Sequence, residues 1–162
     1  MSERIDFSRV RFLIVDGNPL FLDLLHDILR MMGTAVIYRA GDSDRALRIL
    51  SAGETDVAIM EWALEPQTGM DLLRFIRSDP ASPNAMLPVV MLTANSEEEF
   101  VVAARDMGVT EFLAKPFTVE GLYRRLVSVI ARPRPFVRAE GYFGPDRRRR
   151  QVTFDGPERR RR

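Results

Sequence analysis

The stretch DVAIMEW, residues 56–62, places a carboxylate directly after a short apolar run. Residues 57–60 have the length and the continuous apolar character of a strand that is buried on both faces of a sheet. Strands of this kind are typical of parallel sheets that carry helices on both sides. Since ligands bind at the carboxyl ends of the strands in such sheets, Glu61 stands where a functional side chain is expected.

Strand and helix patterns alternate along the rest of the chain. Further strands are predicted at residues 10–15, 35–38, 88–92 and 110–114. Helices are predicted at residues 19–32, 43–50, 68–78, 96–107 and 118–131. This order predicts an α/β fold of five βα units around a parallel sheet.

Polar or small residues follow four of the five predicted strands. Asp16 and Gly17 follow the first, Glu61 the third, Thr93 the fourth and Lys115 the fifth. Because the carboxyl ends of parallel strands meet at one edge of the sheet, we expect these residues to share a pocket. Lys115 is the only lysine in the chain, and it falls where a compact cation suits such a pocket.

The motifs IVDGNP, DVAIMEW, MLTAN and EFLAKPF, with Gly69 eight residues beyond Glu61, occur here in the order of a response regulator receiver domain. Over residues 10–131 the chain resembles this family, and in particular its chemotaxis-type single-domain members. The resemblance implies a (βα)5 flavodoxin-like receiver fold with a parallel five-stranded sheet in the order 2-1-3-4-5. It also implies signalling in a two-component phosphorelay system by protein docking, with no enzymatic activity.

The resemblance assigns a role to each pocket residue. In receiver domains an aspartate at the end of the third strand accepts a phosphoryl group from a histidine kinase, and Glu61 has that phosphoacceptor position. Asp16 matches the first of two acidic positions that help to hold Mg²⁺. Thr93 and Lys115 match the residues that contact the phosphoryl group. Phe112 matches the aromatic residue that changes rotamer in the family's switch.

Two departures from the family pattern argue against phosphorylation. Glutamate places its carboxylate one methylene group, or ~1.5 Å, further from the backbone, and in-line phosphoryl transfer depends on close positioning. Gly17 replaces the second acidic residue, which removes a ligand and a charge from a Mg²⁺ site. No cofactor is therefore expected to be required, and a weak Mg²⁺ site would consist of Asp16, Glu61 and the carbonyl of Ala63.

Three interpretations of the pocket remain open. A Glu61–Lys115 pair could fix one signalling state without phosphorylation. The pocket could instead be degenerate, with the fold kept as a docking platform. The chain could also be an authentic phosphorelay receiver.

The last part of the chain differs in charge from the rest. Residues 132–162 hold 11 arginines and 4 acidic residues, although the net charge of the whole chain is only +1. The motif Gly-Pro-acid followed by four arginines occurs twice, at residues 144–150 and 156–162. Residues 132–162 are rich in proline, glycine and arginine and are predicted to be a disordered basic tail.

This tail resembles the arginine-rich extensions of receiver-like proteins that bind cyclic di-GMP. Arginine pairs bidentately with phosphate and with guanine, and it stacks on aromatic rings. The resemblance implies that two runs of arginines contact the ligand: Arg147, Arg148, Arg149, Arg150, Arg159, Arg160, Arg161 and Arg162. It also implies Tyr142, Phe143 and Phe154 as stacking partners. The alternatives are binding of RNA, DNA or anionic lipid through charge alone, and docking on the acidic body or on another protein.

The expected organisation is an N-terminal extension (1–9), a receiver-like domain (10–131) and the tail (132–162). The resemblance implies docking on a signalling or motor protein through the helix at 96–107, the strand at 110–114 and the helix at 118–131. The chain shows no signal peptide, transmembrane segment or cysteine, and a cytoplasmic location is expected. His26 is expected at the surface or its boundary, and Trp62 at the pocket rim as a partner contact or a packing residue.

Overall fold

The sheet is built from five parallel strands that follow one another along the chain with a helix after each. The computed structural model describes residues 5–94 and 97–148. The strands are β1 (Arg11–Val15), β2 (Val36–Ala40), β3 (Val57–Met60), β4 (Val89–Thr93) and β5 (Glu111–Ala114). Their order within these residues is β2-β1-β3-β4-β5, which confirms the predicted (βα)5 flavodoxin-like fold.

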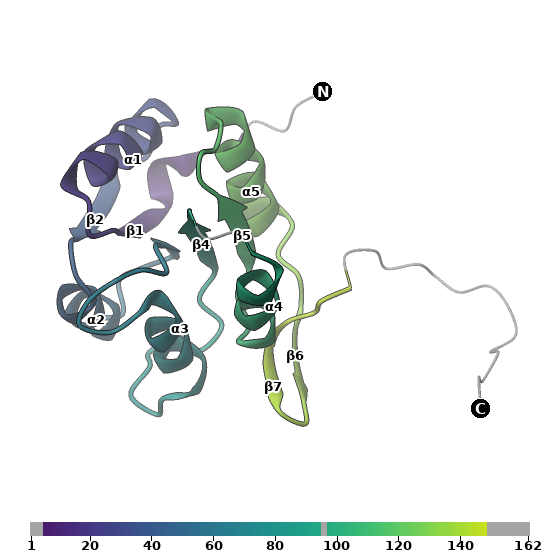
Figure 1. The fold of residues 1–162 in the computed structure, drawn as a ribbon. Helices are drawn as coiled ribbons and strands as arrows, with labels where there is room; N and C mark the ends of the chain where they lie inside the picture. Colours follow the sequence, from purple (N-terminus) through teal and green to yellow (C-terminus); the bar gives the residue numbers. More distant parts are fainter. Residues whose placement is uncertain (1–4, 95–96, 149–162) are drawn as a thin grey trace, which may run out of the picture.

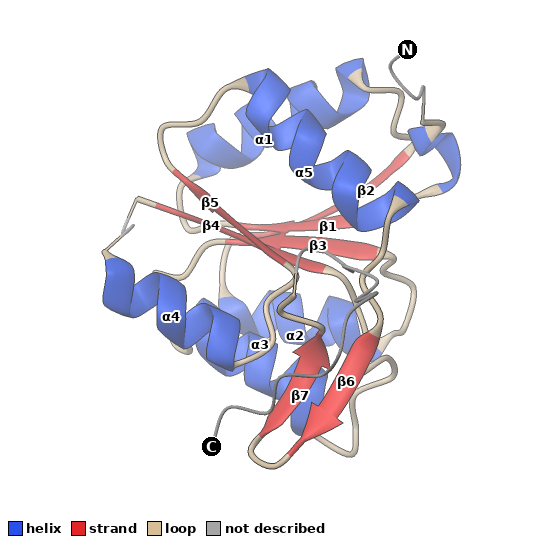
Figure 2. Cartoon of the chain, turned by 90° about the vertical axis from the view of Figure 1, so that its right-hand side faces the viewer, coloured by secondary structure: helices blue, strands red, loops and turns tan. Residues whose placement is uncertain are grey.

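Helices cover both faces of this sheet (Figure 1). They are α1 (Pro19–Met31), α2 (Ser43–Ser51), α3 (Gly69–Ser78), α4 (Glu98–Asp106) and α5 (Val119–Ala131). Figure 2 shows α1 and α5 on one side of the sheet and α2, α3 and α4 on the other. No helix in the described part of the chain combines the length and the apolar character needed to cross a membrane.

Each face of the sheet has its own core, because successive side chains of a strand point to opposite faces. In β1, Leu13 and Val15 belong to the core under α2 and α3. Phe12 and Ile14, which alternate with them, belong to the core under α1 and α5. Since both sets are at most 1% exposed, the strand is apolar throughout, as the sequence pattern requires.

The N-terminal extension is less separate than the sequence predicts. Residues Phe7–Arg9 form a short 3₁₀ helix, η1, and Phe7 is only 2% exposed. The ring of Phe7 lies 6.3 Å from that of Phe12 and 5.9 Å, edge to face, from that of Tyr123. The end of the extension therefore belongs to the core between β1 and α5.

The prediction that the chain beyond residue 132 is disordered is wrong for residues 136–145. Strands β6 (Phe136–Ala139) and β7 (Tyr142–Pro145) form an antiparallel hairpin that turns at Gly141, where φ is +72°. The hairpin lies beside the end of α4, on the same side of the sheet as α2 and α3 (Figures 1 and 2). Residues 149–162 of the predicted tail lie outside the described residues.

A buried arginine anchors this hairpin to the body. Arg77, in the last turn of α3, is 5% exposed and donates hydrogen bonds to the carbonyls of Gly108 at 2.9 Å and Leu87 at 2.7 Å. Its guanidinium group lies 4.9 Å from the centre of the Phe136 ring in β6, a cation–π contact. Burial lowers the pKa of Arg77 to about 10, so the group is still charged at neutral pH and depends on these contacts.

Candidate functional site

The pocket forms where backbone pairing continues one residue past the strands. The N–H of Glu61 donates to the carbonyl of Val15 at 2.9 Å, and the N–H of Lys115 donates to that of Thr93, also at 2.9 Å. These bonds fix the direction of the side chains that leave the sheet edge. The carboxyl ends of the neighbouring parallel strands β1, β3, β4 and β5 therefore bring Asp16, Glu61, Thr93 and Lys115 to the same end of the sheet.

The central feature of the pocket is a lysine that bridges two carboxylates. Lys115 Nζ lies 2.7 Å from Asp16 Oδ2 and 2.7 Å from Glu61 Oε2. Asp16 and Glu61 are only 4% and 7% exposed, so this cation offsets the cost of burying two negative charges. Burial alone would lower the pKa of Lys115, but the hydrogen bonds to Asp16 and Glu61 outweigh it and raise that pKa.

Backbone N–H groups hold the remaining oxygen of each carboxylate. Asn18 N donates to Asp16 Oδ1 at 2.8 Å, and Ala63 N donates to Glu61 Oε1 at 3.1 Å. All four carboxylate oxygens therefore accept a hydrogen bond or an ion pair. This arrangement orients both side chains toward the Lys115 ammonium group.

These residues do not fit the Mg²⁺ site that is typical of receiver domains. Only two carboxylates are present, Gly17 offers no third, and the Lys115 ammonium already lies against an oxygen of each. Within the described residues there is no group of three histidine, cysteine or acidic side chains suited to a metal ion. The pocket is built around an internal cation.

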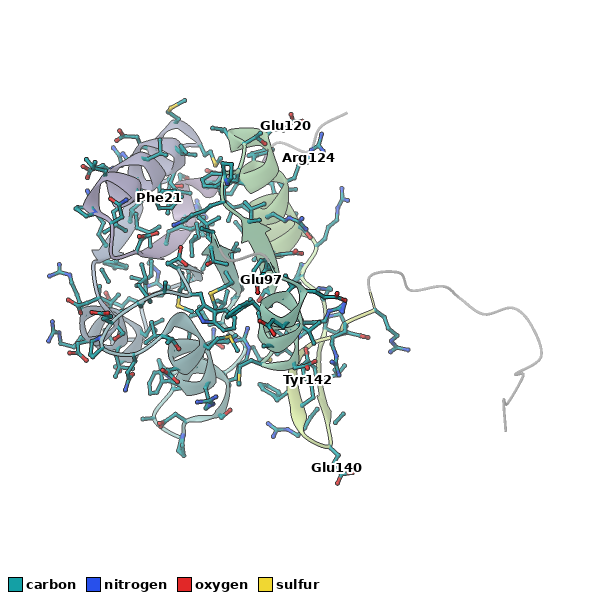
Figure 3. The ribbon with its side chains drawn as sticks, in the orientation of Figure 1. Phe21, Glu97, Glu120, Arg124, Glu140 and Tyr142 are labelled. Atoms are coloured by element: carbon teal, nitrogen blue, oxygen red, sulfur yellow. The ribbon has the colours of Figure 1, made fainter. Side chains whose placement is uncertain are left out.

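An aromatic residue that the sequence analysis did not single out covers the lysine. Lys115 Nζ lies 3.8 Å from the centre of the Phe21 ring, and Phe21 packs edge to face with Phe117 at 5.9 Å. Figure 3 labels Phe21 on α1. The only signal in the sequence was its place in the first helical turn after Asp16, which brings the ring to the same edge of the sheet.

A glycine allows α3 to start directly against the Glu61 backbone. A Cβ atom on Gly69 would lie 2.3 Å from the carbonyl oxygen of Glu61, so only glycine fits there. Gly69 N also donates to the carbonyl of Trp62 at 2.9 Å, and a capping box of Thr68 and Asp71 fixes the first turn of α3. The loop that carries Glu61 is thereby held in place.

Four other residues from the sequence analysis have the following places in the structure. Thr93 is 2% exposed at the end of β4, and Phe112, partly buried in β5, lines a cavity beside α4. Trp62 packs edge to face against Phe100 of α4, with ring centres 5.0 Å apart, so it has a packing contact at the pocket rim. His26 is partly exposed on α1 beside Asp27, at the surface boundary that its sequence context predicts.

Of the arginines assigned to the tail ligand, Arg147 and Arg148 are described and the others are not. Arg147 pairs with Asp106 of α4 at 2.9 Å, and its guanidinium group lies 4.4 Å from the centre of the Tyr142 ring. Arg148 pairs with Asp146 at 3.0 Å. The start of the first arginine repeat therefore lies against the receiver body.

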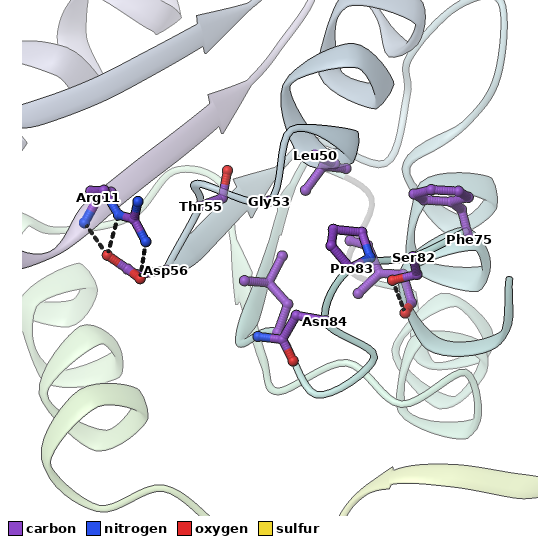
Figure 4. Close-up of a pocket in the computed structure, with 11 residues that line it drawn as sticks. Arg11, Leu50, Gly53, Thr55, Asp56, Phe75, Ser82, Pro83 and Asn84 are labelled. Carbon is purple, nitrogen blue, oxygen red and sulfur yellow. Dashed lines mark hydrogen bonds and ion pairs between the residues drawn. The ribbon is translucent and has the colours of Figure 1, made fainter. Parts of the chain in front are cut away.

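A separate cavity of about 200 Å³ lies at the opposite edge of the sheet (Figure 4). Its charged residues, Arg11 and Asp56, pair with each other at 3.1 Å. Hydrogen bonds from Arg11 hold the pKa of Asp56 below its usual value. The two charged side chains of this cavity therefore neutralise each other.

The comparison with protein families matches the chain to the response regulator receiver domain over residues 12–127. The chemotaxis protein CheY of Pseudomonas aeruginosa is 31% identical over 123 residues, which cover 76% of this chain and 98% of CheY. CheY-3 of Vibrio cholerae is 32% identical over 130 residues, which cover 80% of this chain and 98% of CheY-3.

Solved structures agree with these matches. The chemotaxis response regulator CheY4 of Vibrio cholerae superposes with a TM-score of 0.67 at 25% identity, covering 75% of this chain and 98% of CheY4. A response regulator receiver domain protein of Clostridium thermocellum gives 0.68 at 26% identity, covering 76% of this chain and 95% of its own. The fold, the side chains at the strand ends and these matches show that the chain belongs to the response regulator receiver family of signalling proteins.

Proposed function

We propose that this receiver-family protein docks on its partner without being phosphorylated. The observation that supports this is the Lys115 ammonium, held at 2.7 Å from both Asp16 and Glu61. In a phosphorylated receiver the matching lysine contacts an oxygen of the phosphoryl group. Here the longer carboxylate of Glu61 supplies that anionic oxygen permanently, so the lysine keeps its charged contact in the resting chain.

The docking face of this proposal consists of α4, β5 and α5, as the family resemblance implies. Two of the relatives are chemotaxis proteins, and a signalling or motor protein of chemotaxis is therefore the proposed partner. Phe112 in β5 connects this face to the interior, because it packs against the core that also contains Met60 and Met91. Pocket and docking face are joined through β5, which carries Phe112 and leads directly to Lys115.

Intact-mass measurement of the full chain incubated with acetyl phosphate and Mg²⁺ tests the proposal. No gain of mass is expected, because Glu61 is engaged by Lys115 and the Mg²⁺ ligands are incomplete. A gain of one phosphoryl group that is lost in a Glu61→Gln variant would instead support the alternative, an authentic phosphorelay receiver supplied by a histidine kinase.

A second proposed function is gating by cyclic di-GMP bound to the arginine repeats. It is supported by the contact of Arg147 with the Tyr142 ring at 4.4 Å, which presents a guanidinium group and an aromatic face together. Phosphates and guanine bases are recognised by this combination.

Calorimetric titration of the full chain with cyclic di-GMP, with GTP and a short oligonucleotide as controls, tests this function. Saturable binding that the controls do not share is expected. Equal binding to every anion, with steep salt dependence, would indicate the polyanion-binding adaptor instead.

A further inference from the structure

A cavity of about 440 Å³ lies between α4, β5 and the C-terminal hairpin. This volume is within the range of ~300–1,000 Å³ that is typical of small-molecule sites. Figure 3 labels Tyr142 where the hairpin meets the end of α4. The cavity thus joins the receiver body to the first arginine repeat.

Three arginines from three separate segments line this cavity: Arg105 from α4, Arg134 from the linker after α5, and Arg147 from the chain after β7. In the described part of the chain, the side chain of Arg105 has no hydrogen-bond or ion-pair partner. Arg134 donates to the backbone carbonyls of Thr110 and Asp146, neither of which neutralises its charge.

The acidic residues of the lining do not balance these cations. Glu111 pairs with Arg125 of α5 at 3.2 Å, which leaves Glu98 as the other carboxylate of the lining. Asp106, next to the cavity, is engaged by Arg147. The described surroundings therefore favour an anionic ligand.

The remaining walls are apolar or aromatic. Val101 and Val102 of α4, Phe112 of β5 and Tyr142 of β7 supply flat or aliphatic surface. Arginine forks match phosphate oxygens, and an aromatic ring matches the face of a base. A ligand that carries both groups is a nucleotide.

We propose that this cavity binds a phosphate-bearing nucleotide, with its phosphate on Arg105 and Arg147 and its base against Tyr142. The inference rests on the nucleotide-binding role proposed for the arginine repeats and extends it, because Arg105 belongs to the receiver body. A ligand in this position also lies on the α4–β5 face. Binding would therefore change the surface that is proposed to dock on the partner.

The test compares two arginine variants of the full chain by calorimetric titration with cyclic di-GMP, GMP and inorganic phosphate. Arg105→Ala removes one of the three arginines of the cavity, and Arg48→Ala removes a matched arginine outside it. Each is an exposed arginine in the last turn of its helix, and neither side chain has a partner among the described residues. Arg105→Ala is expected to weaken nucleotide binding at least ~10-fold, the effect of losing one charged hydrogen bond, and Arg48→Ala to leave it unchanged.

A third variant is expected to act in the opposite direction. Asp106→Asn removes the carboxylate that Arg147 now contacts, so Arg147 is released for the phosphate and nucleotide binding should tighten severalfold. If the Arg105→Ala and Arg48→Ala variants both bind nucleotide with the affinity of the wild type, the cavity site is overturned and the tail remains as the receptor. No binding of any of these probes by the wild type would overturn the nucleotide-binding role itself, and the cavity site with it.

Discussion

Lys115 and its two carboxylates determine what the pocket can do. The ammonium group is held by Asp16, by Glu61 and by the ring of Phe21, so a positive charge is already fixed between the carboxylates. A buried pair of like charges without a cation would be strongly unfavourable. This explains how two carboxylates can be buried next to each other in this pocket.

Replacing the lysine should therefore destabilise the protein in a pH-dependent way. The Lys115→Met variant leaves two carboxylates without their cation, and a loss of ~3 kcal/mol in the free energy of unfolding is expected at pH 8. Folding raises the pKa of Lys115. Its contribution to the free energy of unfolding is therefore complete below the pKa of the unfolded chain, ~10.4, and is lost as the pH rises through the pKa of the folded chain. Urea unfolding of both proteins at pH 8 and pH 11 should show a smaller difference at pH 11; an unchanged difference would contradict this role.

Reversing the two departures from the family pattern, at Gly17 and Glu61, should make the chain able to accept a phosphoryl group. A Cβ atom on Gly17 would come no closer than 3.9 Å to its nearest neighbour, so Gly17→Asp fits the structure. The double variant Gly17→Asp/Glu61→Asp is expected to gain one phosphoryl group from acetyl phosphate and Mg²⁺ by intact mass, and the single Gly17→Asp variant is not. Labelling of the single variant to the same extent would mean that glutamate itself is a competent acceptor.

Sequence reasoning could predict this pocket but not its surroundings. Asp16, Glu61 and Lys115 could be predicted to lie together because parallel strands bring their carboxyl ends to one edge of the sheet. The contact of Phe21 with Lys115 could not be predicted, since an aromatic residue in a helix is most often a core residue and nothing in its spacing indicates a lysine partner. The same holds for Arg77, whose acceptors are carbonyls of other segments.

The C-terminal hairpin is the element that could not be predicted from the sequence. Its prolines and glycines resemble those of an irregular segment, and its stabilising partners lie far away in the chain. Gly144 of β7 contacts Gly108 so closely that a Cβ atom on Gly144 would lie 2.7 Å from Gly108 Cα. Gly144, which in the sequence indicated an irregular segment, is thus a residue that allows the hairpin to pack against Gly108.

The Gly144→Ala variant should release the hairpin from the body. Overpacking of this kind costs ~1–3 kcal/mol. Hydrogen exchange of the β6 and β7 amides is expected to accelerate in this variant. Gly41→Ala serves as the control, because a Cβ atom there meets nothing within 4 Å. Equal protection in both variants would show that the glycine contact does not hold the hairpin.

On the scale of the whole molecule, a receiver body with an internal cation is extended by a hairpin beside its proposed docking face. The pairs Arg134–Thr110 and Arg147–Asp106 flank the hairpin and hold the linker after α5 and the start of the first arginine repeat against the body. A ligand that contacts Arg147 is therefore not remote from the α4–β5 face. The two proposed functions would then share one surface.

Truncation should separate the contribution of the hairpin from that of the residues beyond it. Removal of residues 132–162 exposes Arg77 and loses its contact with Phe136, so a stability loss of ~1–2 kcal/mol and a melting temperature lower by ~3–8 °C are expected. Removal of residues 149–162 alone, which keeps the contact between Arg77 and Phe136, should lower the melting temperature less. Identical melting of the two truncated chains would contradict a stabilising role for the hairpin.

The internal cation can be tested directly, because Lys115 is the only lysine in the chain. Nuclear magnetic resonance of protein labelled with ¹⁵N-lysine should give a single side-chain signal, whose pKa can be measured with and without Mg²⁺. A pKa above ~10.4 that millimolar Mg²⁺ does not change, and that falls in the Glu61→Gln variant, is expected. A saturable fall in the pKa on addition of Mg²⁺ would show that the metal displaces the lysine, and would contradict the account of a pocket that needs neither metal nor phosphoryl group.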